Sequence, residues 1–88
     1  MDSAERKALK ARAHKLDPVV IIGSKGLTGE VLAEVERALR AHELIKVRAP
    51  SLERAERGEA LKSLCEKTGA EPVQEIGKVF VLYRKNNE

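Results

Sequence analysis

The rest of the chain is arranged around the stretch Val19-Val20-Ile21-Ile22-Gly23-Ser24-Lys25-Gly26-Leu27-Thr28. It opens with four β-branched apolar residues, which predict a short strand. Two glycines then bracket a serine and a lysine, and glycine lets a chain turn tightly or approach another backbone closely. Thr28 is a good helix N-cap, and an amphipathic pattern begins directly after it. The sequence therefore predicts a strand, a Gly-x-x-Gly turn and a helix in immediate succession.

The predicted turn has the features of a phosphate-binding site. The amides of the turn and of the first helical turn point outward, and the positive end of the helix dipole lies behind them. Lys25 adds a full positive charge at the same place. The alternative is that the two glycines only shape the turn, because a single Gly-x-x-Gly is a weak signal. The rest of the chain has to decide between these interpretations.

Length and composition describe one small globular domain. The chain has 88 residues, of which 42% are hydrophobic and 35% are charged, a profile typical of folded rather than disordered proteins. No apolar run approaches the length of a membrane span, and the first residues carry no secretory signal pattern. Cys65 is the single cysteine, so no internal disulfide can form. We therefore expect a cytoplasmic protein with no membrane association.

The net charge of +3 is unevenly distributed. Residues 1–26 carry six Lys or Arg and three acids, whereas residues 27–58 carry six of each and residues 59–88 carry five of each. The whole excess therefore lies in the N-terminal segment and the glycine turn. Such an imbalance favours a polyanionic partner.

The N-terminal segment predicts a helix from Ser3 to about His14 or Lys15, which Asp17-Pro18 ends. Basic side chains fall within one arc of about 100° on this helix; they are Arg6, Lys7, Lys10 and His14. The alternative is an ordinary solvated face. For this helix in isolation we favour that alternative. A ligand-binding face gains weight because i,i+4 acids do not balance these charges as they do in the later helices.

The remaining pattern predicts helices over residues 29–42 and 53–68 and strands over 44–49, 72–76 and 78–84. His42 falls on the apolar face of its helix, which predicts a partly buried side chain. The order is α-β-α-β-α-β-β, an α/β fold. Right-handed crossovers with parallel strands and a final antiparallel hairpin give a mixed four-stranded sheet packed with three helices.

Several blocks of the sequence resemble the CRM domain, an RNA-binding domain. They are Pro18–Thr28, Leu32–Leu39, His42–Val47, Gln74–Lys78 and Val81–Arg84. The resemblance covers nearly the whole chain and implies a single CRM-like domain over residues 1–85 with a loose tail at 86–88, similar to the stand-alone bacterial YhbY-like proteins. It also implies a fold similar to the C-terminal domain of translation initiation factor three.

The resemblance further implies RNA as the ligand and precursors of the large ribosomal subunit as the setting. The predicted RNA-binding residues are those of the turn and its helix cap, together with the basic arc. They are Gly23, Ser24, Lys25, Gly26, Thr28, Arg6, Lys7, Lys10 and His14. Base stacking is expected to contribute little, because Phe80 and Tyr83 are the only aromatic residues and fall on opposite faces of one strand.

Two other functional classes have to be weighed. One is a protein-interaction module that docks on ribosomal proteins, with the basic face incidental. The other is an enzyme, for which the chemistry is missing. His14, His42 and Cys65 lie on separate elements, no metal-ligand spacing appears, and the turn lacks the nucleotide-binding P-loop pattern. We therefore expect no catalysis, no cofactor and no metal.

Overall fold

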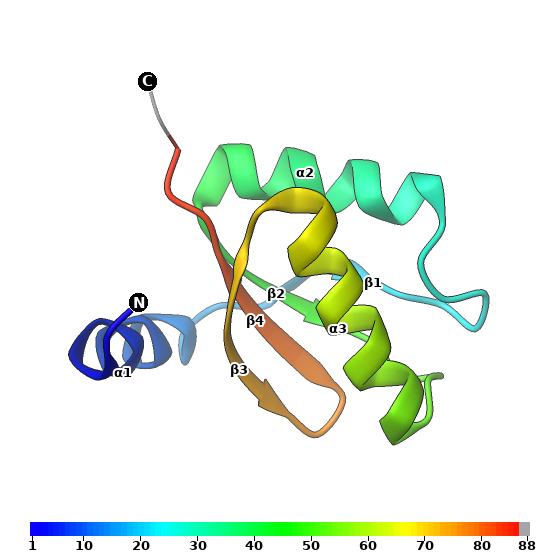
Figure 1. Ribbon diagram of the computed structural model, residues 1–88, viewed down its shortest axis with the longest axis horizontal. Coiled ribbons are helices and arrows are strands. Elements are labelled where there is room, and N and C mark those ends of the chain that lie inside the picture. The colour runs from blue at the N-terminus through cyan, green and yellow to red at the C-terminus, as the bar shows by residue number, and fades with distance from the viewer. Residues whose placement is uncertain (87–88) are drawn as a thin grey trace.

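The computed structural model describes residues 1–86 and contains seven elements in the predicted order (Figure 1). They are α1 (Ser3–Ala13), β1 (Pro18–Ile21), α2 (Gly29–His42), β2 (Leu44–Arg48), α3 (Arg54–Thr68), β3 (Glu71–Ile76) and β4 (Val79–Tyr83). The α-β-α-β-α-β-β prediction is confirmed, and the element ends differ from it by one or two residues.

The four strands form one mixed sheet in the order β1-β2-β4-β3. β1 runs parallel to β2, and β4 is antiparallel to both of its neighbours, β2 and β3. The hairpin turns at Gly77, whose φ is 55°, and it places β4 between β2 and β3. As a result, β2 and β3 point the same way without being neighbours, and the connection through α3 passes over β4.

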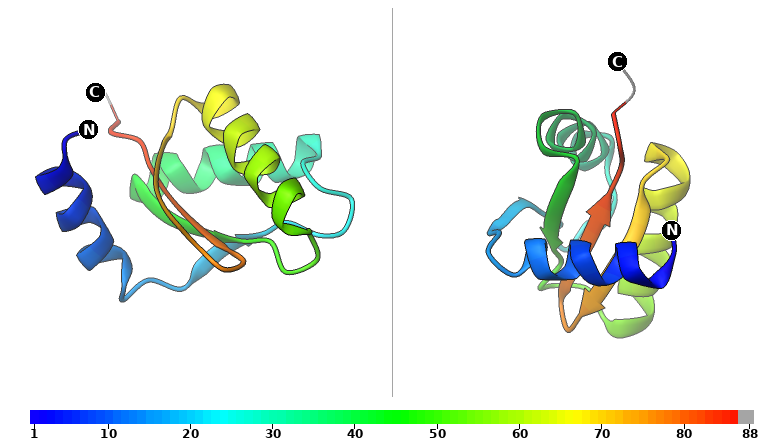
Figure 2. Two further views of the ribbon diagram at one scale, coloured as in Figure 1. Left: turned by 60° about the horizontal axis from the view of Figure 1, so that its bottom comes forward. Right: turned by 90° about the vertical axis from the view of Figure 1, so that its left-hand side faces the viewer.

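The helices cover the two faces of the sheet unequally (Figure 2). α2 and α3 pack on one face over the main core, in which Val35, Leu39 and Phe80 are fully buried. α1 packs on the other face over a smaller cluster; its buried members are Leu9, Ala13, Leu44, Val73 and Val81. Buried residues next to each other in β2 and β4 join different clusters, because successive side chains of a strand point to opposite faces of the sheet.

Side chains cap the first two helices, and the cap predicted at Thr28 is confirmed. The carboxylate of Asp2 accepts a bond of 2.8 Å from the amide of Glu5 at the start of α1. The hydroxyl of Thr28 accepts a bond of 3.2 Å from the amide of Val31 at the start of α2. Each cap satisfies a helix amide that has no partner within its own helix.

Arg6 fastens α1 to the edge strand β3. Its guanidinium donates hydrogen bonds to the carbonyl oxygens of Pro72, at 2.7 Å, and of Val73, at 3.2 Å. The side chain is half-buried as a consequence. This arginine therefore sets the position of α1 on the sheet.

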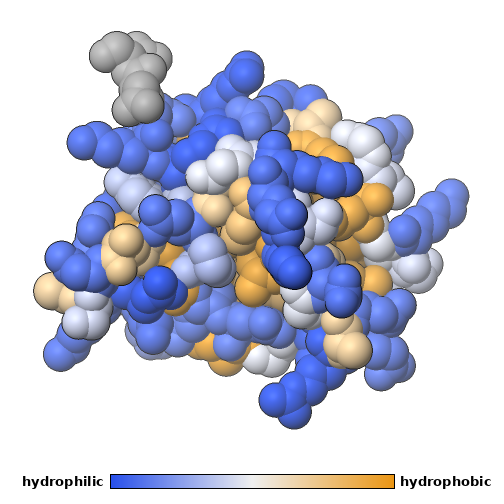
Figure 3. All heavy atoms as spheres, viewed as in Figure 1, coloured by the Kyte–Doolittle hydropathy of each residue, from blue (hydrophilic) through white to orange (hydrophobic). Residues whose placement is uncertain are grey.

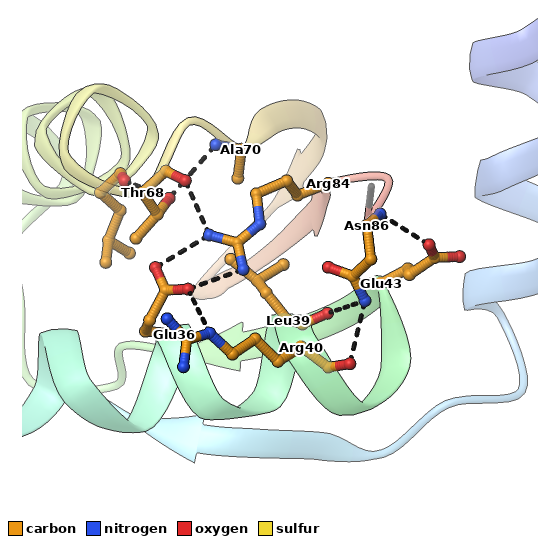
Figure 4. Close-up of polar contacts among 9 residues, drawn as sticks. Glu36, Leu39, Arg40, Glu43, Thr68, Ala70, Arg84 and Asn86 are labelled. Atoms are coloured by element: carbon orange, nitrogen blue, oxygen red, sulfur yellow. Dashed lines mark hydrogen bonds and ion pairs between the residues drawn. The ribbon is translucent and has the colours of Figure 1, made fainter. Parts of the chain in front are cut away.

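The last described residues join the C-terminal ends of α2 and α3 (Figure 4). Arg84 binds both carboxylate oxygens of Glu36, at 2.8 and 2.7 Å, and also donates to the carbonyl oxygen of Thr68. Asn86, the first residue of the tail expected from the sequence, donates from its side chain to two main-chain carbonyls at the end of α2. Residues 87 and 88 of that tail lie outside the described residues.

His42 is exposed, and the prediction of a partly buried side chain is wrong. The buried face of α2 ends at Leu39. Directly after His42, Glu43 adopts a φ of 64° and the chain reverses into β2. The last turn of α2 therefore extends past the packed part of its apolar face.

The Glu36–Arg84 pair should make stability depend on pH. Hydrogen bonding to Arg84 lowers the pKa of Glu36 below its ordinary value of 4.5. A lowered carboxyl pKa stabilises the fold above that ordinary value, and the contribution is lost as the pH falls through the folded-state pKa. We expect Glu36→Gln to cost about 1 kcal/mol at pH 7 and much less at pH 3. Urea unfolding at both pH values measures this, and an equal loss at both would contradict it.

Candidate nucleic-acid interface

The glycine turn begins where β1 loses its partner strand. The amide of Ile22 donates to the carbonyl oxygen of Arg48 at 2.7 Å, and the amide of Gly26 then closes the turn on the carbonyl oxygen of Gly23 at 3.0 Å. Gly26 has a φ of 73°, a conformation that suits glycine. Gly23 has no positive φ, and a Cβ placed on it would meet no atom within 4 Å. The fold therefore requires glycine at position 26 but not at position 23.

The turn presents hydrogen-bond donors that the protein does not use. Within residues 1–86, the main-chain amides of Ser24, Lys25, Gly29 and Glu30 have no acceptor. All four residues are exposed. The N-terminus of α2 adds the positive end of its dipole at this place. Unsatisfied amides, a helix N-terminus and a lysine together can hold an anion.

The predicted basic arc is only partly free. Lys7, Lys10 and His14 are exposed, and no carboxylate of the described residues lies within 4.0 Å of their nitrogens. Arg6 is instead committed to the carbonyl oxygens of β3. Three of the four side chains can therefore meet a ligand without breaking a contact in the fold.

The structure does not bring the turn and the basic arc together. α1 lies at one end of the molecule and the turn that joins β1 to α2 lies at the other (Figures 1 and 2). The longest dimension of the fold is 33 Å. A ligand that contacts both has to extend across the molecule.

Two cations that were absent from the predicted site lie between these ends. Lys46 and Arg48 are on the face of β2 that α1 covers only in part, and Arg48 pairs with Ile21 immediately before the turn. The sequence did contain a signal for them, because they alternate with the buried Ile45 and Val47. What it could not show is that this face remains open beside the turn.

The charge around the turn is one-sided. On its α3 side, Gly26 and Leu27 share a hollow with Glu56 and Glu59, and no cation lines that hollow. On the opposite side lies Arg48. Figure 3 shows a largely hydrophilic face, with apolar atoms gathered mainly in the half that holds α2, α3 and the turn. The turn thus has two carboxylates on its α3 side and a cation on its β2 side.

Cys65, the metal-ligand residue types and the helix lengths bear on other kinds of site. Burial raises the pKa of the Cys65 thiol, which keeps it in its less nucleophilic form. Residues 1–86 contain no group of three His, Cys, Asp or Glu side chains arranged to hold a metal ion. Within the same residues, no helix is both long enough and apolar enough to cross a membrane.

The chain is similar to bacterial proteins whose names describe RNA binding. A probable RNA-binding protein of Pseudomonas aeruginosa is 48% identical over 82 residues, which cover 93% of this chain and 79% of that protein. An RNA-binding protein of Haemophilus influenzae is 42% identical over 88 residues, covering 100% of this chain and 89% of that one.

A solved structure shares the fold. The solution structure of a Staphylococcus aureus protein, described as an RNA-binding candidate, matches with a TM-score of 0.87 and 31% identity, covering 100% of this chain and 92% of that one. The model of the CRS1 / YhbY (CRM) domain matches residues 1–84. This chain therefore belongs to the CRS1/YhbY (CRM) domain family.

Proposed function

We propose that this chain binds RNA mainly through the sugar-phosphate backbone, at the glycine turn and at the basic side of α1. The observation that carries the proposal is the set of exposed amides without acceptors beside Lys25. The printed names of the relatives, which describe RNA-binding proteins, support RNA as the ligand.

At the turn, phosphate oxygens accept hydrogen bonds from the free amides, and the Lys25 ammonium neutralises their charge. The absence of a side chain at Gly23, where the fold leaves space for one, lets a ribose approach the main chain. KH domains clamp about four nucleotides of backbone with a Gly-x-x-Gly loop in this manner. Thr28 contributes by capping α2, which fixes the amides at the helix start.

Lys7, Lys10 and His14 form a second contact at the far end of the molecule. Because the two contacts are separated, the RNA has to be several nucleotides long or folded into a shape that reaches both. Aromatic stacking contributes little, since Phe80 is fully buried and Tyr83 packs against the cluster under α1. Selectivity then comes from RNA shape more than from base identity.

The setting we propose is the assembly of the large ribosomal subunit in the cytoplasm, with ribosomal RNA in its precursors as the partner. This part rests on the family resemblance. A second candidate function is docking on ribosomal proteins. One observation favours it, namely that the side chains of Ile21 and Ile76 are each 59% exposed.

The central test replaces Ser24 and Lys25 together by Asp. The substitutions keep both glycines and place negative charge where a phosphate should lie. We expect RNA affinity to fall by at least about 2 kcal/mol, and the slope of log K against log salt to decrease by about 0.7 for each phosphate that the variant no longer neutralises. Fluorescence anisotropy with a single-stranded RNA over a salt series measures both quantities. Wild-type affinity and slope in a folded variant would refute the backbone clamp.

Substitution of Gly26 should affect mainly folding, and substitution of Gly23 should affect mainly RNA binding. Gly26→Ala puts a Cβ on a residue with positive φ and should cost about 1 kcal/mol of stability. Gly23→Ala has open space and should change stability by less than about 0.5 kcal/mol, yet weaken RNA binding because the Cβ keeps the backbone of the RNA away. Thermal melts and RNA titrations of both variants check this. Full RNA affinity in Gly23→Ala would show that the close approach is not used.

The basic helix is tested by Lys7→Glu combined with Lys10→Glu. Both side chains are exposed and unpaired within the described residues, so the melting temperature should hardly change while RNA affinity falls severely. The matched control is Lys62→Glu with Lys67→Glu on α3, which alters the net charge equally and should have a much smaller effect. Equal losses of RNA affinity in the two variants would show that α1 contributes only through the net charge of the protein.

A further inference from the structure

Part of the sheet face under α1 is uncovered and carries an apolar row. Beyond the end of α1, four residues stand in register across all four strands; they are Ile21, Arg48, Val79 and Ile76. The two isoleucines at the sheet edges are each 59% exposed. This row combines aliphatic surface with a single cation.

A groove runs between this face and α1. From α1 it is lined by Lys10, Ala13 and His14. From the sheet it is lined by Lys46, Gln74, Ile76, Val79 and Val81. Its volume is about 330 Å³, within the range of small-ligand sites and enough for one or two nucleobases.

The groove combines apolar side chains with positive charge. Valine, isoleucine and alanine side chains form its floor, and Lys10 and Lys46 supply positive charge. No carboxylate is among the residues that line it. The Gln74 side chain offers both a donor and an acceptor, which suits the edge of a base. Cations around an apolar floor with one amide favour an anionic ligand that carries flat apolar rings.

The groove is connected to the glycine turn by cations on β2. Lys46 and Arg48 are two residues apart on the same face of that strand, a separation of about 7 Å. Arg48 adjoins the turn through the bond from Ile22. Since Glu56 and Glu59 occupy the other side of the turn, the cationic path for an RNA strand leads over Arg48 and Lys46 into the groove.

We propose that this groove binds a nucleobase of the RNA strand whose backbone the glycine turn holds. The base lies on Val79 and Ile76 with Gln74 at its edge, while Lys10 and Lys46 contact the flanking phosphates. The inference rests on the proposed function and adds a site for a base to a surface otherwise described by backbone contacts. It also makes α1 and the turn two ends of one binding path.

The test compares two probes and three variants. The probes are a mixed-sequence single-stranded RNA of twelve nucleotides and an oligomer of the same length without bases. The groove variant combines Ile76→Ser with Gln74→Ala, which changes no charge. The control is Val19→Ser, because Val19 is also about half exposed, at 49%, but lines a different hollow. The third variant is the Ser24→Asp, Lys25→Asp protein.

We expect the groove variant to bind the RNA about fivefold more weakly, with its salt slope unchanged and its affinity for the base-free oligomer equal to that of the wild type. Val19→Ser should bind both probes normally. The turn variant should lose affinity for both probes. In wild-type protein, 4-thiouridine in the RNA should crosslink to residues 74–81 on irradiation.

Full RNA affinity in a groove variant with a normal melting temperature would overturn the base site while leaving the turn in place. An equal loss for both probes would also overturn it, since no base would then be involved. Loss of binding to ribosomal proteins with RNA binding intact would assign the groove to a protein partner instead. If the Ser24→Asp, Lys25→Asp protein bound RNA normally while the groove variant bound it weakly, the proposed clamp at the turn would be refuted and the base site would not.

Discussion

The parallel pairing of β1 with β2 is the constraint on which the position of the candidate site depends. It buries Val20 and Ile22 in the main core and ends at the bond from the Ile22 amide to the Arg48 carbonyl. Beyond that bond the chain has no strand to follow, so it must turn before α2 can begin. The register of this pairing fixes which side chains enter the core. It therefore also fixes the position of the turn at the sheet edge. There the amides of the turn face solvent, and Arg48 lies beside them.

The length of α1 decides what the other face of the sheet can do. An α-helix of 11 residues is only about 16 Å long, and Arg6 holds it over one end of the strands. The uncovered part of this face lies between the basic helix and the turn. Lys46 and Arg48 place positive charge on it, while Glu56 and Glu59 lie on the α3 side of the turn. The path proposed for an RNA strand follows from this distribution of charge.

Local signals in the sequence predicted the elements and the cap of α2, because Thr28 acts on an amide only three residues away. The strand order escaped prediction, since β4 is placed between β2 and β3 by pairing between distant residues. A helical wheel likewise counted Arg6 among the free cations, although its guanidinium reaches carbonyl oxygens 66 and 67 residues away. The shape of the turn could therefore be predicted from contiguous residues, whereas the open face of the sheet is assembled by tertiary structure and could not.

The exposed isoleucines at the two sheet edges bear on function because the fold makes no use of them. Uncovered apolar edge strands can pair with strands of other chains, and two features of this sheet limit such pairing. β1 has only four residues and begins with Pro18, and β3 carries Pro72 at a register shift, so both edges are poor templates for a further strand. Ile21 and Ile76 can then stay exposed without promoting association along the edges. An apolar surface kept open between cations fits a ligand that is itself partly apolar and negatively charged, which describes a nucleotide better than a phosphate alone.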